Sequence, residues 1–193
     1  MILDYSEFLA FNLNDFQRAI SQLNQAAEKA IKPFDQGRFR LLLGDILVFN
    51  KRYNEALVNY ALVQGALKND DLAQEAKFKE AQTSYFRGDF DWAQSQLKIL
   101  KSSTSQKIAN DAIALHVLIN ENTLEDSTQT ALKKYAAAEL LIHQNQYSNA
   151  ITTLQELQTD PKLDRLADDV MHTLGLTHLK IGNHDTAKRY WKS

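Results

Sequence analysis

The chain has 193 residues, a length that suits one elongated domain or one extended repeat array. Its 22 basic and 24 acidic side chains leave a net charge of −2, so no basic stripe for a nucleic-acid backbone is predicted. The absence of cysteine excludes disulfides and thiol catalysis, and no apolar run of about 18 residues predicts a membrane span.

The composition favours helices throughout. Only six glycines and two prolines occur, helix formers such as Ala, Leu, Gln, Lys and Glu are plentiful, and no alternating β-branched run predicts a strand. In chain order, we predict helices at 2–11, 15–31, 36–49, 53–67, 70–87, 90–101, 105–120, 126–144, 147–158, 163–181 and 184–193. Pro33 and Pro161 both fall between predicted helix pairs, where a missing N–H is tolerated.

An aromatic-x-x-Ala element, with His replacing the aromatic in the last copy, opens the second helix of each pair. The alanines are spaced 37, 37, 57 and 37 residues apart, and a large apolar residue follows four places after each. The alanines are Ala19, Ala56, Ala93, Ala150 and Ala187, and the large residues are Leu23, Tyr60, Leu97, Leu154 and Trp191. Such a period predicts a solenoid, in which each helix pair buries its apolar face against its neighbours.

Two further positions keep the same spacing. A small residue stands twelve places before four of the alanines, as Gly44, Ala81, Ala138 and Gly175, whereas the first copy has Glu7. A turn-like pair precedes each aromatic position: Asn14-Asp15, Lys51-Arg52, Gly88-Asp89, Asn145-Gln146 and Gly182-Asn183. The pattern predicts a helical hairpin in which the small residue lets the second helix approach and the alanine occupies the facing slot.

These residues resemble the tetratricopeptide repeat family, best from Gly44 through Tyr53 and Ala56 to Tyr60. The resemblance covers residues 2–101 and 131–193, and segment 88–111 looks like tetratricopeptide proteins of unassigned role in Bacteroidota. The chain departs from the family pattern at Arg40, Lys77, Lys134 and Glu80, and its period exceeds the usual length of about 34 residues. The resemblance implies an all-α solenoid of antiparallel helix pairs in a right-handed superhelix, from a bacterial protein that binds protein or peptide.

Residues 1–193 are expected to form one array of hairpins at about 2–31, 36–67, 70–101, 126–158 and 163–193. Both ends look cut, so we expect a fragment of a longer protein. The long interval places an extra helix near 105–120, with Ile108, Ala112, Leu115 and Ile119 on one face. This helix is either the remnant of a degenerate repeat or an insertion that bends the superhelix and forms a partner pocket.

The resemblance also implies where a partner would bind. The family's concave face corresponds here to Leu41, Asp45, Phe49, Phe78, Gln82, Phe86, Tyr135, Glu139, His143 and His172. This largely aromatic and apolar face predicts a groove for an apolar segment or helix of a partner protein. The alternative for each single position is burial in the core, since apolar residues at helical spacing usually pack there.

No catalytic residue, metal site or cofactor is predicted. The five histidines include no i, i+4 pair that could hold a metal on one helix, and the scattered glycines form no phosphate loop. A non-enzymatic scaffold is therefore expected. The alternatives are a regulatory domain of a larger multidomain protein, or self-association through the end hairpins near Trp191. The first residues are no signal peptide, which leaves a cytoplasmic or periplasmic location open.

Overall fold

The fold is all-α, with consecutive helices packing against one another as in a helical-repeat solenoid. The computed structural model describes residues 1–68, 70–103, 105–123, 129–159 and 164–191, and no strand occurs among them. The helices are α1 (Ile2–Phe11), α2 (Phe16–Lys29), α3 (Pro33–Phe49), α4 (Tyr53–Leu67), α5 (Asp71–Phe86), α6 (Phe90–Leu100), α7 (Gln106–Thr123), α8 (Thr130–His143), α9 (Tyr147–Gln158), α10 (Ala167–Lys180) and α11 (His184–Tyr190), with a 3-10 turn, η1 (Asp164–Leu166), before α10.

The predicted helices are confirmed, with shifted ends at a few positions. Helix α3 begins at Pro33, three residues before the predicted start, because proline at the first helical position loses no intrahelical hydrogen bond and already has a helical φ. The start predicted at residue 163 lies outside the described residues, and η1 precedes α10, which begins at Ala167. The start of the helix predicted at 126–144 and the position of Pro161 also lie outside the described residues.

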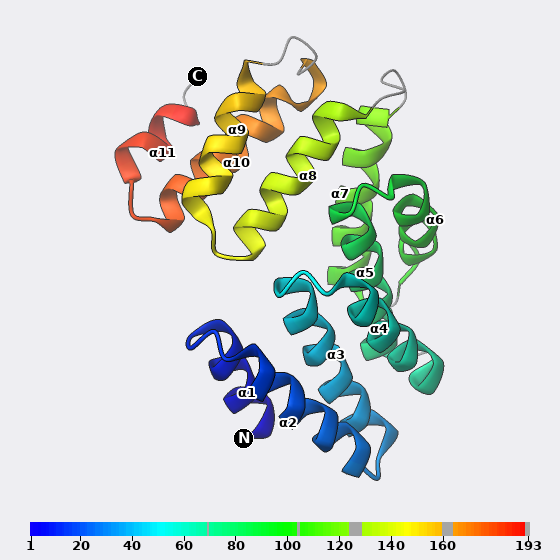
Figure 1. Cartoon of the computed structure of the whole chain (residues 1–193). Coiled ribbons are helices and arrows are strands. Elements are labelled where there is room, and N and C mark those ends of the chain that lie inside the picture. The colour runs from blue at the N-terminus through cyan, green and yellow to red at the C-terminus, as the bar shows by residue number, and fades with distance from the viewer. Residues whose placement is uncertain (69, 104, 124–128, 160–163, 192–193) are drawn as a thin grey trace. The chain divides into compact units, whose positions relative to one another are not determined.

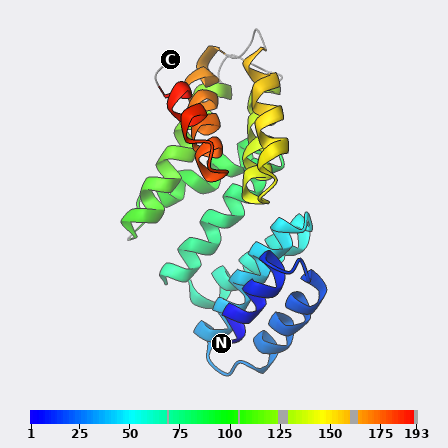
Figure 2. The same ribbon diagram turned by 90° about the vertical axis from the view of Figure 1, so that its left-hand side faces the viewer.

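The chain divides into two compact units. The first unit is Met1–Ser84 with Asp91–His116, and the second is Tyr85–Phe90 with Val117–Ser193. Within the first, α1 packs on α2, α2 on α3 and α3 on α4 (Figure 1). Within the second, α8, α9, α10 and α11 pack in succession (Figure 2). In a repeat array, each helix packs against its neighbours in the sequence. That residues 1–193 form one single array stays a prediction.

The five hairpin turns share one backbone conformation. The first residue of each predicted turn pair has a positive φ, between 55° and 82°, and these residues are Asn14, Lys51, Gly88, Asn145 and Gly182. In three of the turns the next N–H, of Arg52, Gln146 or Asn183, donates to the carbonyl five residues earlier at 2.8–2.9 Å. A left-handed residue with this hydrogen bond is a common helix C-cap. The same cap therefore ends the first helix of each of these three pairs.

The repeated alanines are all buried, with exposed fractions of 0–1%. The smaller the residue at the small position of the first helix, the larger the side chain sixteen residues later. A methyl group at Gly44 would overlap the ring of Tyr60, and one at Gly175 would overlap the indole of Trp191. The equivalent positions of the other two pairs hold alanine and leucine, as Ala81 with Leu97 and Ala138 with Leu154.

One detail of the predicted hairpin differs in the structure. In the first hairpin, Glu7 is exposed and the buried small residue is Ser6, one place earlier. The hydroxyl of Ser6 donates to Gln22 of α2 at 3.4 Å.

Candidate functional site

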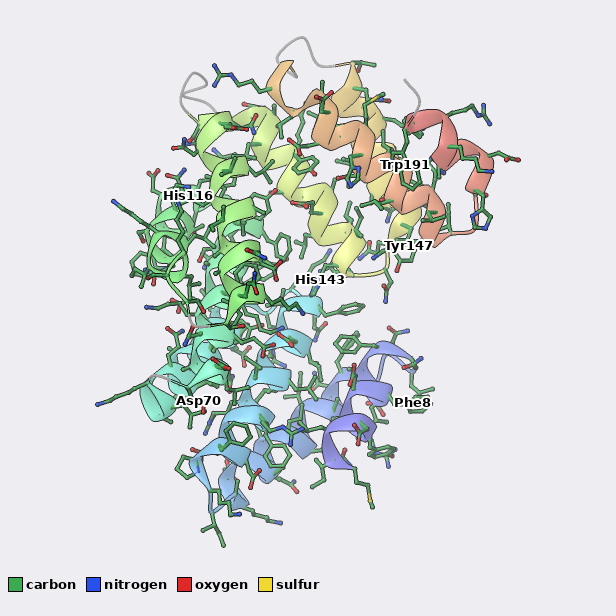
Figure 3. All side chains as sticks on the ribbon, turned by 180° about the vertical axis from the view of Figure 1, so that it is seen from behind. Phe8, Asp70, His116, His143, Tyr147 and Trp191 are labelled. Atoms are coloured by element: carbon green, nitrogen blue, oxygen red, sulfur yellow. The ribbon has the colours of Figure 1, made fainter. Side chains whose placement is uncertain are left out.

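A cavity of about 570 Å³ lies in the first unit, beside α5. It is bounded by residues from the start of α3, from one face of α5 and from the start of α7. We call it the α5–α7 groove, and its lining is Phe34, Asp70, Asp71, Leu72, Glu75, Phe78, Lys79, Gln82, Ser105, Lys107, Ile108 and Asp111. Figure 3 marks Asp70, which stands just before α5. Three segments that are distant in the sequence thus meet in one concave site.

Side chains accept backbone hydrogen bonds at the start of α5 and just before α7. The carboxylate of Asp70 accepts a hydrogen bond from the N–H of Leu72 at 2.8 Å, a common helix N-cap arrangement. The hydroxyl of Ser103 accepts from the N–H of Ser105 at 3.2 Å, just before α7 begins. The Asp70 cap stabilises the first turn of α5, and the Ser103 contact orders the turn that precedes α7.

The lining combines apolar side chains with an excess of negative charge. Phe34, Leu72, Phe78 and Ile108 supply the apolar surface, and Phe34 is 47% exposed. Four carboxylates, Asp70, Asp71, Glu75 and Asp111, stand against the two ammonium groups of Lys79 and Lys107. An exposed phenylalanine in a concave site is surface that a partner can bury.

One of the two lysines already has acidic partners. The Nζ of Lys79 lies 2.9 Å from Oδ2 of Asp45 on α3 and 3.8 Å from Oε1 of Glu75. The other oxygen of Asp45 accepts a hydrogen bond from the hydroxyl of buried Tyr60 at 2.8 Å. This chain of contacts ties α3, α4 and α5 together and neutralises much of the positive charge of Lys79.

The five predicted contact residues of the first unit divide into three groups. Phe78 and Gln82 line the α5–α7 groove. Asp45 lies next to it through its ion pair with Lys79. Leu41 is buried, with 8% of its surface exposed, and the ring of Phe49 contacts Phe11 at 5.0 Å and Phe16 at 5.8 Å between centroids. The packing of Leu41 and Phe49 matches the core role that the sequence left open.

The second unit holds a hydrogen-bonded polar cluster built around Glu139. The hydroxyl of Tyr85 donates to the Glu139 carboxylate at 2.5 Å, and Tyr135, one helical turn before Glu139, has its hydroxyl 2.7 Å from that of Thr173. Burial raises the pKa of Glu139 to about 7, with a smaller rise from the charge of Asp169, while the Tyr85 hydrogen bond lowers it. Burial likewise raises the pKa values of Tyr85 and Tyr135.

The remaining predicted residues of this unit are aromatic or exposed. The ring of Phe86 lies 5.9 Å from that of His143, and His172 lies 6.4 Å from the indole of Trp191. His143 and His172 are both exposed. Tyr135 is buried, with 4% of its surface exposed, and therefore serves the core of the unit. Figure 3 labels His143 from the first of these ring pairs and Trp191 from the second.

Most of the groove was not predicted from the sequence. Five of its lining residues stand at positions that the repeat pattern does not mark as contact positions: Phe34, Leu72, Lys79, Lys107 and Asp111. The long interval before the fourth alanine was the one available signal, because it placed an extra helix here whose apolar face includes Ile108. The first turns of that helix, α7, do line a cavity.

Among the described residues, no group of three or more His, Asp or Glu side chains is placed to hold a metal ion. Across the same residues, no helix has both the length and the apolar character needed to cross a membrane. In comparisons with known proteins, no family model, no curated protein and no solved structure matches the chain.

Proposed function

We propose that this chain is a non-enzymatic binding scaffold of tetratricopeptide type, and that the α5–α7 groove receives a segment of a partner protein. The observation that carries the proposal is the cavity of about 570 Å³, which contains Phe78 and Gln82 of the predicted contact face together with exposed Phe34. A mostly preformed cavity of this size accommodates a few side chains of a bound segment.

The arrangement of the repeats supports this proposal. The sequence resembles the tetratricopeptide pattern in its alanines, small residues and turns, and the described hairpins use those positions for close helix packing. The first helices of two such hairpins, α3 and α5, contribute to the groove together with α7. Helical arrays commonly use the surfaces between successive repeats to bind extended or helical segments.

Replacing Phe78 by alanine is expected to weaken partner binding by about 30-fold, because an aromatic anchor in a concave site contributes on the order of 2 kcal/mol. The probe is the tightest-binding peptide selected on the wild-type protein from a random library of about 12 residues, titrated by fluorescence anisotropy. The matched control is Phe8→Ala, which removes a phenylalanine that is 48% exposed on α1, outside the groove.

Circular dichroism of both variants checks that the helices are retained. If the peptide binds Phe78→Ala and Phe8→Ala as tightly as it binds the wild-type protein, the groove is not the binding site and the proposal is wrong.

A second candidate function is self-association through the exposed face of α10. His172, Leu176 and Leu179 follow i, i+4, i+7 spacing, and the two leucines are 42% and 41% exposed. The indole of Trp191, 45% exposed, lies beside His172 and extends this apolar surface. A second copy of the chain could cover it.

For this candidate, sedimentation velocity over a dilution series is expected to show an oligomer that dissociates on dilution. The variant Leu176→Lys/Leu179→Lys is expected to stay monomeric at every concentration, because two buried ammonium groups would be costly in such an interface. A wild-type protein that sediments as a monomer throughout the series rules out this function.

A further inference from the structure

We infer, on the basis of the binding function proposed for the α5–α7 groove, that the groove selects a partner segment in which an apolar anchor residue is flanked by lysine or arginine. Two observations support it: carboxylates surround the apolar lining, and one of the two lining lysines, Lys79, already has acidic partners.

The charge balance of the groove is negative although that of the whole chain is nearly neutral. Four carboxylates and two ammonium groups line the cavity. Lys79 contacts Asp45 at 2.9 Å and Glu75 at 3.8 Å, so its charge is shared with carboxylates before any partner arrives. A bound segment therefore meets a surface on which negative potential dominates, and complementary positive charge is favoured there.

The carboxylates lie on both walls of the cavity. Asp71 and Glu75 belong to the beginning of α5 and Asp70 stands just before it, whereas Asp111 belongs to α7 and is exposed. The apolar side chains of Leu72 and Phe78 on α5 and of Ile108 on α7 line the same two walls. A partner segment that inserts an apolar side chain between these walls brings its flanking residues next to carboxylates of both helices.

The same geometry disfavours two other classes of ligand. An acidic peptide would bring carboxylates close to those of Glu75 and Asp111, which costs free energy in a partly desolvated site. A nucleic-acid strand needs several basic side chains along its phosphates. Two lysines line the groove, and Lys79 is already paired with Asp45 and Glu75. Among the described contacts, this leaves Lys107 as the one lining cation without such an ion pair.

The first test is a selection that works without an identified partner. A random library of peptides of about 12 residues is displayed on phage and selected on the full wild-type chain, and the selected peptides are then titrated against both the wild-type protein and Phe78→Ala. The expected result is enrichment of Lys and Arg around an aromatic or aliphatic residue, and depletion of Asp and Glu, relative to the unselected library.

The second test measures the contribution of charge to the affinity of the tightest selected peptide. Glu75→Gln/Asp111→Asn removes two groove carboxylates with little change in shape, and its affinity is expected to fall by about threefold to tenfold. The control Glu7→Gln/Glu28→Gln makes the same change in net charge on α1 and α2, outside the groove, and is expected to stay within about twofold. Raising the salt concentration should weaken wild-type binding and should reduce the difference between the two variants.

The outcomes separate this inference from the function on which it rests. Selected peptides that are neutral or acidic but still lose affinity on Phe78→Ala overturn the preference for positive charge and leave the binding groove in place. Equal weakening by the two double variants also overturns it, because only overall charge would then matter. Peptides that bind Phe78→Ala unchanged overturn the binding groove itself.

Discussion

Gly44→Ala is expected to lower the free energy of unfolding of the first unit by about 1–3 kcal/mol, the usual cost of overpacking. In an exposed helix the same change would be favourable by about 1 kcal/mol, since alanine is the better helix former. The sign reverses here because the new methyl group would overlap the ring of Tyr60. That ring is 1% exposed and its hydroxyl is hydrogen-bonded to Asp45, so it has little freedom to move away.

Hydrogen exchange followed by mass spectrometry measures this effect locally, through the protection of the amides of α3 and α4. Amides of α9 and α10 in the second unit serve as an internal reference. Gly65→Ala is the matched control, because Gly65 is exposed on α4 and a methyl group there meets no atom within 4 Å. It is expected to stabilise α4 by about 1 kcal/mol. Destabilisation of similar size in both variants would contradict the steric explanation.

The same explanation predicts compensation within a double-mutant cycle. Gly44→Ala/Tyr60→Leu recreates the pairing found at Ala81 and Leu97 in the next hairpin. Tyr60→Leu alone loses buried volume and the hydrogen bond to Asp45, whereas in the Gly44→Ala background the smaller side chain also relieves the overlap. The double variant is expected to be more stable than the sum of the single changes predicts, by at least about 1 kcal/mol. Simple additivity would show that the two side chains do not compete for space.

The free energy of unfolding of the second unit is expected to fall by roughly 3 kcal/mol as the pH rises from about 4.5 to about 8. Burial raises the pKa of Glu139 to about 7 in the folded chain, from an ordinary value of 4.5. Between these two values the unfolded chain has released this proton and the folded chain still holds it. Rising pH therefore favours unfolding until the folded carboxyl group also ionises, near pH 7, after which the stability no longer changes through this group.

Urea unfolding followed by tryptophan fluorescence can isolate this effect. Trp92 and Trp191 are the two tryptophans of the chain. Replacing the exposed Trp92 by phenylalanine therefore leaves Trp191 as a reporter within the second unit. In this background, Glu139→Gln keeps an oxygen that can accept the hydrogen bond of Tyr85 but has no proton to lose. We expect the variant to show a nearly flat pH dependence over the same range. A slope as steep as that of the parent would assign the effect to other groups.

Much of the fold could be predicted from the sequence because it depends on local interactions. Helix propensity, the turn pairs and the period of the alanines predicted the helices, and Asn145 and Gly182 have the left-handed backbone expected of such turns. The repeat also predicted which alanines are buried, since a residue that faces the neighbouring helix does so in every copy. These features recur at intervals of 37 residues, with one interval of 57, and a recurring pattern can be recognised in a single sequence.

The groove and the polar cluster required the tertiary structure. Phe34, Phe78 and Ile108 come together only through the packing of three helices, and the sequence states neither their distances nor the presence of Asp111 beside them. The contact between Tyr85 and Glu139 joins residues 54 positions apart, on helices separated by an irregular interval in the repeat. The sequence by itself determined the helices, their turns and the buried alanines, because short-range spacing encodes them. Only the tertiary structure decided where charge and apolar surface converge, because that depends on long-range contacts that occur once in the chain.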